Sequence, residues 1–312
     1  LSSGGGAAAV GAGGRDSSGE TGQGLIPLRL GDQFGYVTPE GGLISVSRVR
    51  YGLAQSATRY SNYSVIRETI VLQRPDGSLM QSIPTSGYPH LDGDRLFIFA
   101  PNGNGLSEWG EDGGKKWSRA FLPVITDLDA GPTRTAVGLL NGQVELLGPN
   151  GESEFSYETE GSRYVVTLAV ALGPDENVLA AVSGIDPQKL VLFERHTEGF
   201  FPTLELDLET DYRRPVFLRF LRDGKTLVAE RQDGFLAYDM EEETFRRVGL
   251  GGSVRSVVSL SDYGLLVSAA AVGGARSPRV QRLQATVAPG RPLFRQSAVA
   301  EDVFLEASGS RI

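Results

Sequence analysis

The chain has 312 residues, of which 40% are hydrophobic and 22% are charged, and its formal net charge is −8. This length suits one large all-β domain or two domains of average size. The acidic balance argues against general nucleic-acid binding, which needs a basic surface, and the absence of cysteine excludes disulfides, thiolate metal sites and cysteine nucleophiles.

Residues 1–24, LSSGGGAAAVGAGGRDSSGETGQG, are rich in glycine and contain no aromatic side chain. Such a segment buries too little apolar surface to offset the entropy lost on ordering, so we expect a flexible tether before a folded unit at 25–312. The stretch AAAV (7–10) is typical of the region near a signal-peptide cleavage site. An ordinary flexible N-terminus is the alternative. No run of ~18 apolar residues is present, so we expect no membrane span.

From residue 34 onward, apolar residues alternate with a period of two and the runs stop at Gly, Asp, Asn or Pro, which predicts short β-strands joined by tight turns. No stretch has a convincing helical stripe with caps, so the fold class is all-β. The opening pair of strands is FGYVTPEGGLISVSRV (34–49). Six repeats of strand, turn, strand, turn, strand, turn, strand follow, at 51–84, 89–122, 125–158, 165–206, 216–249 and 254–298.

The repeats begin about 35–50 residues apart, which is typical of the four-stranded blades of a β-propeller. A lone four-stranded sheet has two apolar faces, and radial stacking buries both. The last residues, DVFLEASGSRI (302–312), begin a seventh repeat that residues 34–49 would complete. We therefore expect a seven-bladed propeller whose two ends share one blade, which removes an open sheet edge. Eight blades remain the alternative if residues 25–50 hold more structure.

Two stretches carry a family resemblance, LRDGKTLVAERQDGFLAYD (221–239) and LDAGPTRTAVGLLNGQVELLGPNGE (128–152). They resemble the bacterial WD-repeat-like β-propeller superfamily in their Asp-Gly turns and in a strand ending in Asp. The stretch LSEWGEDGGKKW (106–117) resembles a repeat of the pyrroloquinoline-quinone-type propellers, with Trp117 as the packing tryptophan. The resemblance covers about residues 34–312. It implies the fold and leaves the function open, because propellers include enzymes, scaffolds and ligand binders.

Several short motifs resemble known sites but lack the remaining residues. DGKT (223–226) lacks the glycine and the helix of a phosphate-binding loop. DGD (92–94) and DLD (127–129) begin like calcium loops and stop, so we interpret these aspartates as turn caps. His90 and His196 are too few for a multi-histidine metal site, and we expect His196 to be exposed in a turn. We therefore expect neither a metal nor a cofactor.

One set of residues favours binding. In a propeller, the loops that lead into the innermost strands surround one mouth of the central channel, and Tyr with Arg or His recurs in these loops. Tyr and Arg often supply the binding energy of interfaces, and Arg suits carboxylates. The predicted binding residues are Tyr51, Tyr88, His90, Arg163, Tyr164, Tyr212, Arg213, Arg214 and Arg255. The alternative is structural: each Arg pairs with a nearby carboxylate and each Tyr packs between blades.

The sequence thus favours a monomeric, non-catalytic propeller outside the cytoplasm, periplasmic or tethered to the cell envelope. Its expected partner is another protein, recognised through an acidic segment, and not a nucleic acid. One rival is a lyase or glycoside hydrolase that uses residues of the channel mouth, which acidic residues inside the channel would favour. Another is an outer-membrane assembly scaffold that resembles the quinone-type propellers without their cofactor.

Overall fold

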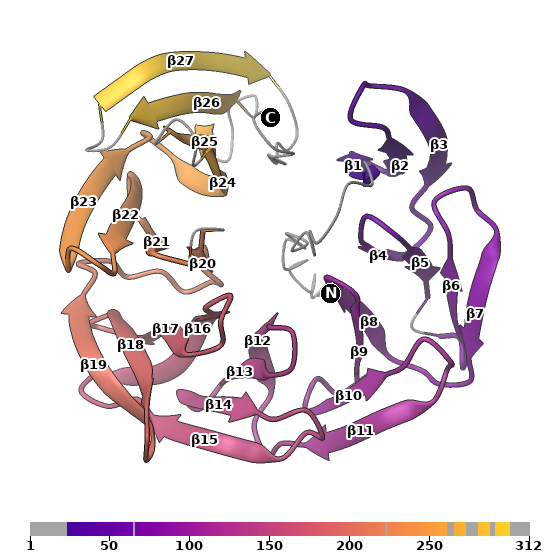
Figure 1. The fold of residues 1–312 in the computed structure, drawn as a ribbon, viewed down its shortest axis with the longest axis horizontal. Helices are drawn as coiled ribbons and strands as arrows, with labels where there is room; N and C mark the ends of the chain where they lie inside the picture. Colours follow the sequence, from indigo (N-terminus) through magenta and orange to yellow (C-terminus); the bar gives the residue numbers. More distant parts are fainter. Residues whose placement is uncertain are drawn as a thin grey trace, which may run out of the picture.

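The structure, a computed structural model, consists of seven antiparallel β-sheets arranged around a central opening (Figure 1). It describes residues 24–64, 66–221, 224–260, 265–272, 280–287 and 291–299. The first sheet has three strands and the other six have four each. The expected all-β, seven-bladed propeller is therefore confirmed.

The first sheet contains β1 (Ile26–Leu30), β2 (Gln33–Val37) and β3 (Leu43–Arg48). The next three contain β4 (Gly52–Gln55), β5 (Tyr60–Tyr63), β6 (Ile70–Gln73) and β7 (Leu79–Ile83); β8 (Tyr88–Asp92), β9 (Arg95–Phe99), β10 (Gly105–Trp109) and β11 (Lys115–Ala120); and β12 (Ile125–Ala130), β13 (Thr135–Leu139), β14 (Gln143–Leu147) and β15 (Ser153–Glu158). The last three contain β16 (Tyr164–Leu172), β17 (Val178–Ile185), β18 (Lys189–His196) and β19 (Gly199–Asp207); β20 (Leu218–Phe220), β21 (Thr226–Arg231), β22 (Gly234–Asp239) and β23 (Thr244–Gly249); and β24 (Ser253–Leu260), β25 (Leu265–Val272), β26 (Val280–Val287) and β27 (Arg291–Val299).

Each four-stranded sheet is built from consecutive strands, and the chain enters it on the strand nearest the central opening (Figure 1). The outermost strand then leads to the innermost strand of the next sheet. All the innermost strands therefore begin at the same end of the channel. We call that end the entry face: it comprises the loops before the innermost strands and the turns between the second and third strands of each sheet.

The N-terminal sheet differs from the others. The prediction of two strands within residues 34–49 is confirmed as β2 and β3, but the sequence interpretation missed β1, which joins the same sheet and adds no eighth blade. Because β3 leads directly into the innermost strand β4, β3 is the outermost strand of its sheet and β1 is the second. None of the residues that the structure describes fills the innermost position. The expected closing strand, 302–312, lies outside the described residues, as do residues 1–23 of the expected tether at 1–24.

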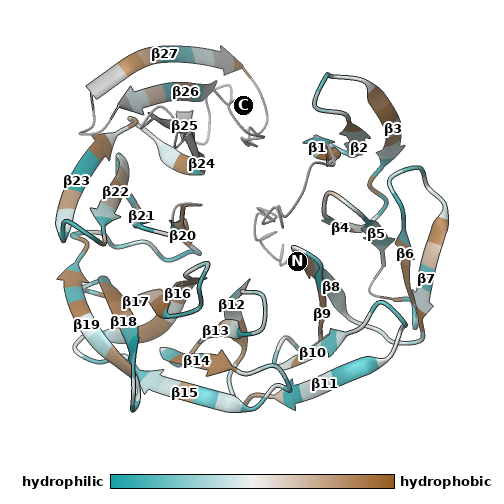
Figure 2. Cartoon of the chain, in the orientation of Figure 1, coloured by the Kyte–Doolittle hydropathy of each residue, from teal (hydrophilic) through white to brown (hydrophobic). Residues whose placement is uncertain are grey.

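Apolar side chains are buried between neighbouring sheets. Phe97 and Trp117 of the third sheet pack with Val137 and Leu147 of the fourth, and equivalent clusters join the other pairs of sheets that follow one another along the chain. The outer strands β11 and β15 show long hydrophilic stretches, whereas β14 is mostly hydrophobic (Figure 2). This arrangement explains the short continuous apolar runs of the inner strands, such as β13, all of whose residues are buried, since both faces of these strands meet another sheet. Alternation remains on outer strands such as β15.

Trp117 has the packing role that the resemblance implied. Its side chain is 6% exposed and lies against Gly151, in the turn after β14 of the next sheet. A Cβ atom at Gly151 would lie 2.7 Å from the indole ring. No helix in the described part of the chain is long and apolar enough to cross a membrane.

Candidate functional site

Five of the nine predicted binding residues are well exposed on the entry face. Tyr51, before β4, is 74% exposed, and Tyr164, at the start of β16, is 50% exposed. Arg213 and Arg255 are also exposed. The Arg163 side chain, 70% exposed, lies over the ring of Tyr164 at 5.3 Å. These residues come from four different sheets, in the entry loops or near the start of the innermost strand, and the arginine and tyrosine at 163–164 form a contacting pair.

Arg163 also has a carboxylate neighbour. Its guanidinium lies 3.8 Å from Asp186, whose side chain is 68% exposed. A pair so open to water contributes at most about 1 kcal/mol, so an incoming carboxylate could replace Asp186 at little cost.

Tyr212 and Arg214 belong to a structural cluster. Arg214 donates two hydrogen bonds, of 2.8 and 3.0 Å, to Glu230 on β21, a residue that is only 1% exposed. Its guanidinium lies 4.3 Å from the centre of the Tyr212 ring. Burial raises the pKa of Tyr212, and the charge of Glu230 adds to this effect. At this position the structure matches the alternative interpretation, in which the arginine satisfies a local buried carboxylate.

Tyr88 and His90 lie on β8, partly buried, and pack edge-on against Tyr63 and Phe99 respectively. Burial lowers the pKa of His90 to about 4, although the nearby charge of Asp129 acts in the opposite direction. His90 is therefore neutral at pH 7. It offers an imidazole to the channel wall and no positive charge to an acidic partner. His196 is exposed as expected, although it ends strand β18 and does not lie in a turn.

Three aspartates on the innermost strands connect neighbouring sheets. Asp127 and Asp129 of β12 accept hydrogen bonds from the main-chain N–H groups of Val170 (2.8 Å) and Leu172 (2.6 Å) on β16. Asp92, at the end of β8, accepts one from Ala130 on β12 (2.7 Å). The interpretation of these residues as turn caps is wrong: Asp127 and Asp129 lie within a strand, and all three bind main chain of the next sheet.

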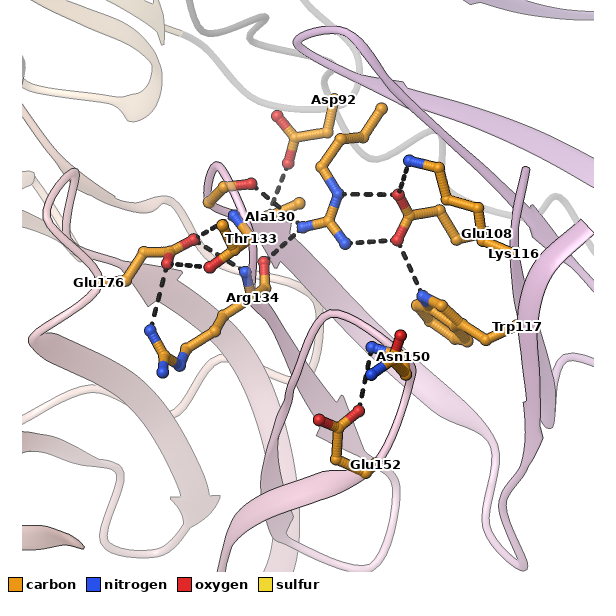
Figure 3. A network of polar contacts seen from close by, with 12 residues as sticks. Asp92, Glu108, Lys116, Trp117, Ala130, Thr133, Arg134, Asn150, Glu152 and Glu176 are labelled. Carbon is orange, nitrogen blue, oxygen red and sulfur yellow. Dashed lines mark hydrogen bonds and ion pairs between the residues drawn. The ribbon is translucent and has the colours of Figure 1, made fainter. Parts of the chain in front are cut away.

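A polar network lies at the opposite face of the ring, around the turns after the innermost strands (Figure 3). Glu108 on β10, 2% exposed, binds Arg95 (2.5 Å), Lys116 (2.9 Å) and the indole N–H of Trp117 (2.9 Å). Burial on its own would raise the pKa of Glu108, but the hydrogen bonds and charges of Arg95 and Lys116 outweigh it and lower that pKa. The carboxylate is therefore ionised and fixed.

A second carboxylate continues the network to the fifth sheet. Glu176, 5% exposed, lies in the turn after β16 and accepts hydrogen bonds from the main-chain N–H groups of Thr133 (2.6 Å) and Arg134 (2.8 Å). It also accepts one from the Thr133 hydroxyl (2.5 Å) and pairs with the Arg134 guanidinium (3.3 Å). These contacts lie between the first turns of neighbouring sheets, so their role is structural.

An arginine closes the first turn in three successive sheets, and the sequence interpretation did not single out this series. Arg59 donates to the carbonyl of Asp94 in the next sheet, and Arg95 donates to the carbonyls of Gly131 (3.1 Å) and Arg134 (2.5 Å). Arg134 pairs with Glu176 one sheet further on. Alignment of the turns at ATRY, GDRL and PTRT would have shown the recurring arginine.

Among the described residues, no group of three or more His, Asp or Glu side chains has an arrangement that could hold a metal ion. The acidic residues of the channel wall instead bind main-chain N–H groups. The exposed Tyr and Arg side chains of the entry face are the part of the predicted set that an external ligand can reach.

Comparisons with known proteins agree with this architecture. The family described as "beta-propeller protein" matches residues 8–269. An uncharacterized protein of Treponema pallidum (strain Nichols) is 26% identical over 235 residues, which cover 75% of this chain and 62% of that protein. The chain thus spans somewhat less than two thirds of the length of this relative.

The fold is also similar to the crystal structure of BamB from Moraxella catarrhalis. The TM-score is 0.62, the sequence identity is 11%, and the match covers 92% of this chain and 89% of BamB. At this identity the likeness concerns the fold alone. The family match and the structural match confirm the resemblance to the bacterial propeller superfamily, and the chain belongs to the family of beta-propeller proteins.

Proposed function

We propose that this chain is a non-catalytic, protein-binding propeller of the bacterial cell envelope, and that its partner docks on the entry face. The single observation that carries the proposal is the exposed Arg163–Tyr164 pair, which the fold presents at the channel mouth. Residues 1–24 would act as a tether to the envelope, an assignment supported by their glycine-rich composition. We further propose that 25–312 is one domain and acts as a monomer.

The Arg163–Tyr164 pair suits a protein ligand for two reasons. The tyrosine ring offers a rigid apolar surface with a polar hydroxyl, and such side chains supply much of the binding energy at interfaces. The ring also holds the guanidinium above it, which limits the entropy lost when a partner carboxylate binds. An acidic segment of the partner is therefore the ligand we expect at this position.

Arg213 extends the same surface across the channel mouth. Its neighbour Arg214 is occupied by Glu230, whereas Arg213 is exposed and near the mouth. In this interpretation Arg214 and Tyr212 fix the loop, and Arg213 contacts the partner. Arg255, near the start of β24 in the next sheet, would contribute beside Arg213, and Tyr51 would contribute from the second sheet, on another part of the ring.

The experiment is co-purification from the native host, followed by measurement of the affinity of the identified partner for purified variants. Arg163→Ala combined with Arg213→Ala is preferred to any change at Arg214, because loss of Arg214 would leave the buried Glu230 without its cation and destabilise the fold. We expect the double variant to bind at least about tenfold more weakly, with a smaller difference at high salt because ionic contacts are screened.

The matched control is Arg74→Ala combined with Arg195→Ala, two exposed arginines in or beside the turns before β7 and β19, away from the entry face. It should bind within about twofold of the parent, as expected for surface changes remote from the site. Unchanged binding by a folded Arg163/Arg213 variant would refute the proposed site.

A further inference from the structure

The entry face carries a group of exposed apolar side chains that the fold itself does not require. Leu122 is 100% exposed in the loop between β11 and β12, and Leu140 is 52% exposed in the turn between β13 and β14. Val124 is 41% exposed, Tyr164 50% and Val165 48%. Single exposed leucines are ordinary on protein surfaces, whereas apolar groups gathered on one face indicate interaction sites.

Backbone contacts join these residues into one surface. The N–H of Leu140 donates to the carbonyl of Val124 at 2.9 Å, which connects the loop before β12 to the turn after β13. A Cβ atom at Gly142 in that turn would lie 3.0 Å from the Cβ of Val165. Tyr164 directly precedes Val165 in the sequence. We call this surface the apolar dock: Leu122, Val124, Leu140, Tyr164 and Val165.

The backbone that presents the dock is well anchored. Phe121, next to Leu122 in sequence, is 6% exposed and packs in the core, and its N–H donates to the carbonyl of Asn104 at 2.7 Å. Ile125 donates to the carbonyl of Gly103 at 2.9 Å. The apolar side chains are therefore held outward by an ordered framework, so a partner would lose little entropy in fixing them.

Most of the backbone that forms the dock is uncharged. The segments 100–107, 120–126 and 135–144 contain no Asp, Glu, Lys or Arg, although 22% of the whole chain is charged. Charged groups lie at one edge, where Glu158 and Glu160 are exposed on either side of Thr159, whose hydroxyl donates to the carbonyl of Gly142 at 2.8 Å. Arg163 lies over the ring of Tyr164, a dock residue. The surface thus suits apolar side chains, and Arg163 is the cation that stacks on one of its residues.

We propose that the apolar dock binds a short linear segment of a partner protein, one that carries at least two aliphatic or aromatic side chains and an acidic residue placed to meet Arg163. This inference rests on the proposed function and specifies its ligand: the apolar side chains supply the affinity, and the carboxylate sets the orientation.

Two other occupants fit the surface less well. A membrane would be attracted by basic residues near its anionic headgroups, whereas the three segments of the dock have none and the chain carries a net charge of −8. A second copy of the chain would need an interface of roughly 20–30 residues a side, far more than the five side chains of the dock. A linear segment matches this size.

The test uses the full chain as bait for a displayed library of random 12-residue peptides. We expect enrichment of sequences with two or more apolar residues and a nearby Asp or Glu. The consensus peptide is then synthesised with a fluorophore, and its affinity is measured for Leu122→Asp combined with Leu140→Asp. Both side chains point into solvent, so the variant should fold as the parent does, and its melting temperature checks this.

We expect the dock variant to bind the consensus peptide at least about tenfold more weakly, as for loss of apolar anchors. The control is Leu43→Asp combined with Leu79→Asp, two leucines that are 65% and 64% exposed on the outer strands β3 and β7. It should bind within about twofold of the parent. Raising the salt concentration should weaken binding less than about threefold, because apolar contacts are not screened.

The remaining outcomes overturn the inference. Absence of an enriched motif, or equal losses in the dock and control variants, would exclude a linear ligand at the dock. Peptide binding lost in the Arg163/Arg213 variant and kept in the Leu122/Leu140 variant would leave the proposed function standing without the dock. Binding to phosphatidylcholine vesicles, or concentration-dependent dimerisation, that Leu122→Asp abolishes would assign the surface to a membrane or to a second copy.

Discussion

Single carboxylates connect the blades of this propeller by binding main-chain N–H groups of the next sheet. Asp127 is the clearest case. Its burial, with the nearby charges of Asp129 and Asp92, raises its pKa to about 7, although the hydrogen bond from Val170 partly opposes the shift. In the unfolded chain the same group has a pKa near 3.9. The native state therefore favours the protonated form.

The sign of the pH dependence follows from this difference. Because the carboxyl of Asp127 has a higher pKa in the folded protein than in the unfolded chain, its contribution to the free energy of unfolding is complete below pH 4. That contribution is lost as the pH rises through 7. Asp127→Asn keeps an oxygen that can accept the hydrogen bond from Val170 and removes the ionisation. The free energy of unfolding of the variant and of the parent is measured in urea at both pH values. The difference between the variant and the parent should be about 2 kcal/mol larger at pH 8 than at pH 5, in favour of the variant.

Asp211→Asn serves as the control for this prediction, since Asp211 is exposed in the loop before β20. It should shift stability equally at both pH values. A parallel response of Asp127→Asn and Asp211→Asn would show that the channel-wall aspartate is already ionised in the folded protein.

Among the elements, the strands and turns within a blade were predictable and the contacts between blades were not. Asn-Gly and Asp-Gly pairs set the hairpins in four of the six full repeats, because glycine readily adopts the positive φ these turns need, as at Gly142 (φ 84°). Strand β1 was missed because IPLRL is short and contains a proline. Asp127 and Asp129 were assigned to a turn because aspartate is common in turns, and no local pattern shows that the N–H groups of β16 lie within reach.

The same limit applies to the candidate site. The repeat pattern predicted Tyr and Arg in the entry loops, and Tyr51, Arg163 and Arg213 do lie in them. It could not show which arginine would bind a local carboxylate. Arg213 and Arg214 are adjacent and alike in sequence, and only the fold shows that Arg214 binds Glu230. The exposed Leu122 and Leu140 could not be told from their buried apolar neighbours Phe121 and Leu139, since exposure depends on the neighbouring sheet.

The turn between β14 and β15 illustrates how closely neighbouring blades pack. Gly151 has a φ of 79° and lies against the indole of Trp117 in the preceding sheet. Gly151→Ala should lower the free energy of unfolding by roughly 2–4 kcal/mol, because it adds both backbone strain and a steric overlap. Chemical denaturation followed by tryptophan fluorescence measures this directly.

Gly249→Ala is the matched change, since no atom lies within 4 Å of the added methyl group and the backbone there is extended. It should alter stability by less than about 1 kcal/mol. If the two alanine variants were equally stable, the contact between Gly151 and Trp117 would contribute nothing to the blade interface.

At the scale of the whole molecule, the stability of the ring depends on how the N-terminal sheet is completed. The described residues of that sheet leave its innermost position unfilled, and β1 occupies the second position. We predict that residues 302–312 form the missing strand. Their deletion should lower the melting temperature by at least about 5 °C, because it reopens a sheet edge and uncovers apolar surface.

Deletion of residues 1–23 is the companion experiment. A tether contributes no buried surface, so this deletion should leave the melting temperature within about 1 °C of the parent. Equal melting temperatures for the parent and for the chain without 302–312 would exclude closure by the C-terminal segment.

Several contacts between blades share a chemical asymmetry that bears on how such rings grow. In the bonds from Asp92, Asp127 and Asp129, and in those from Arg59 and Arg95, one blade supplies the side chain and the next supplies only main chain. Every residue has a main-chain carbonyl, and every residue except proline has an N–H. A tandem gene duplication of one blade would therefore place its Asp or Arg against a new neighbour that already has the required group, with no second substitution needed.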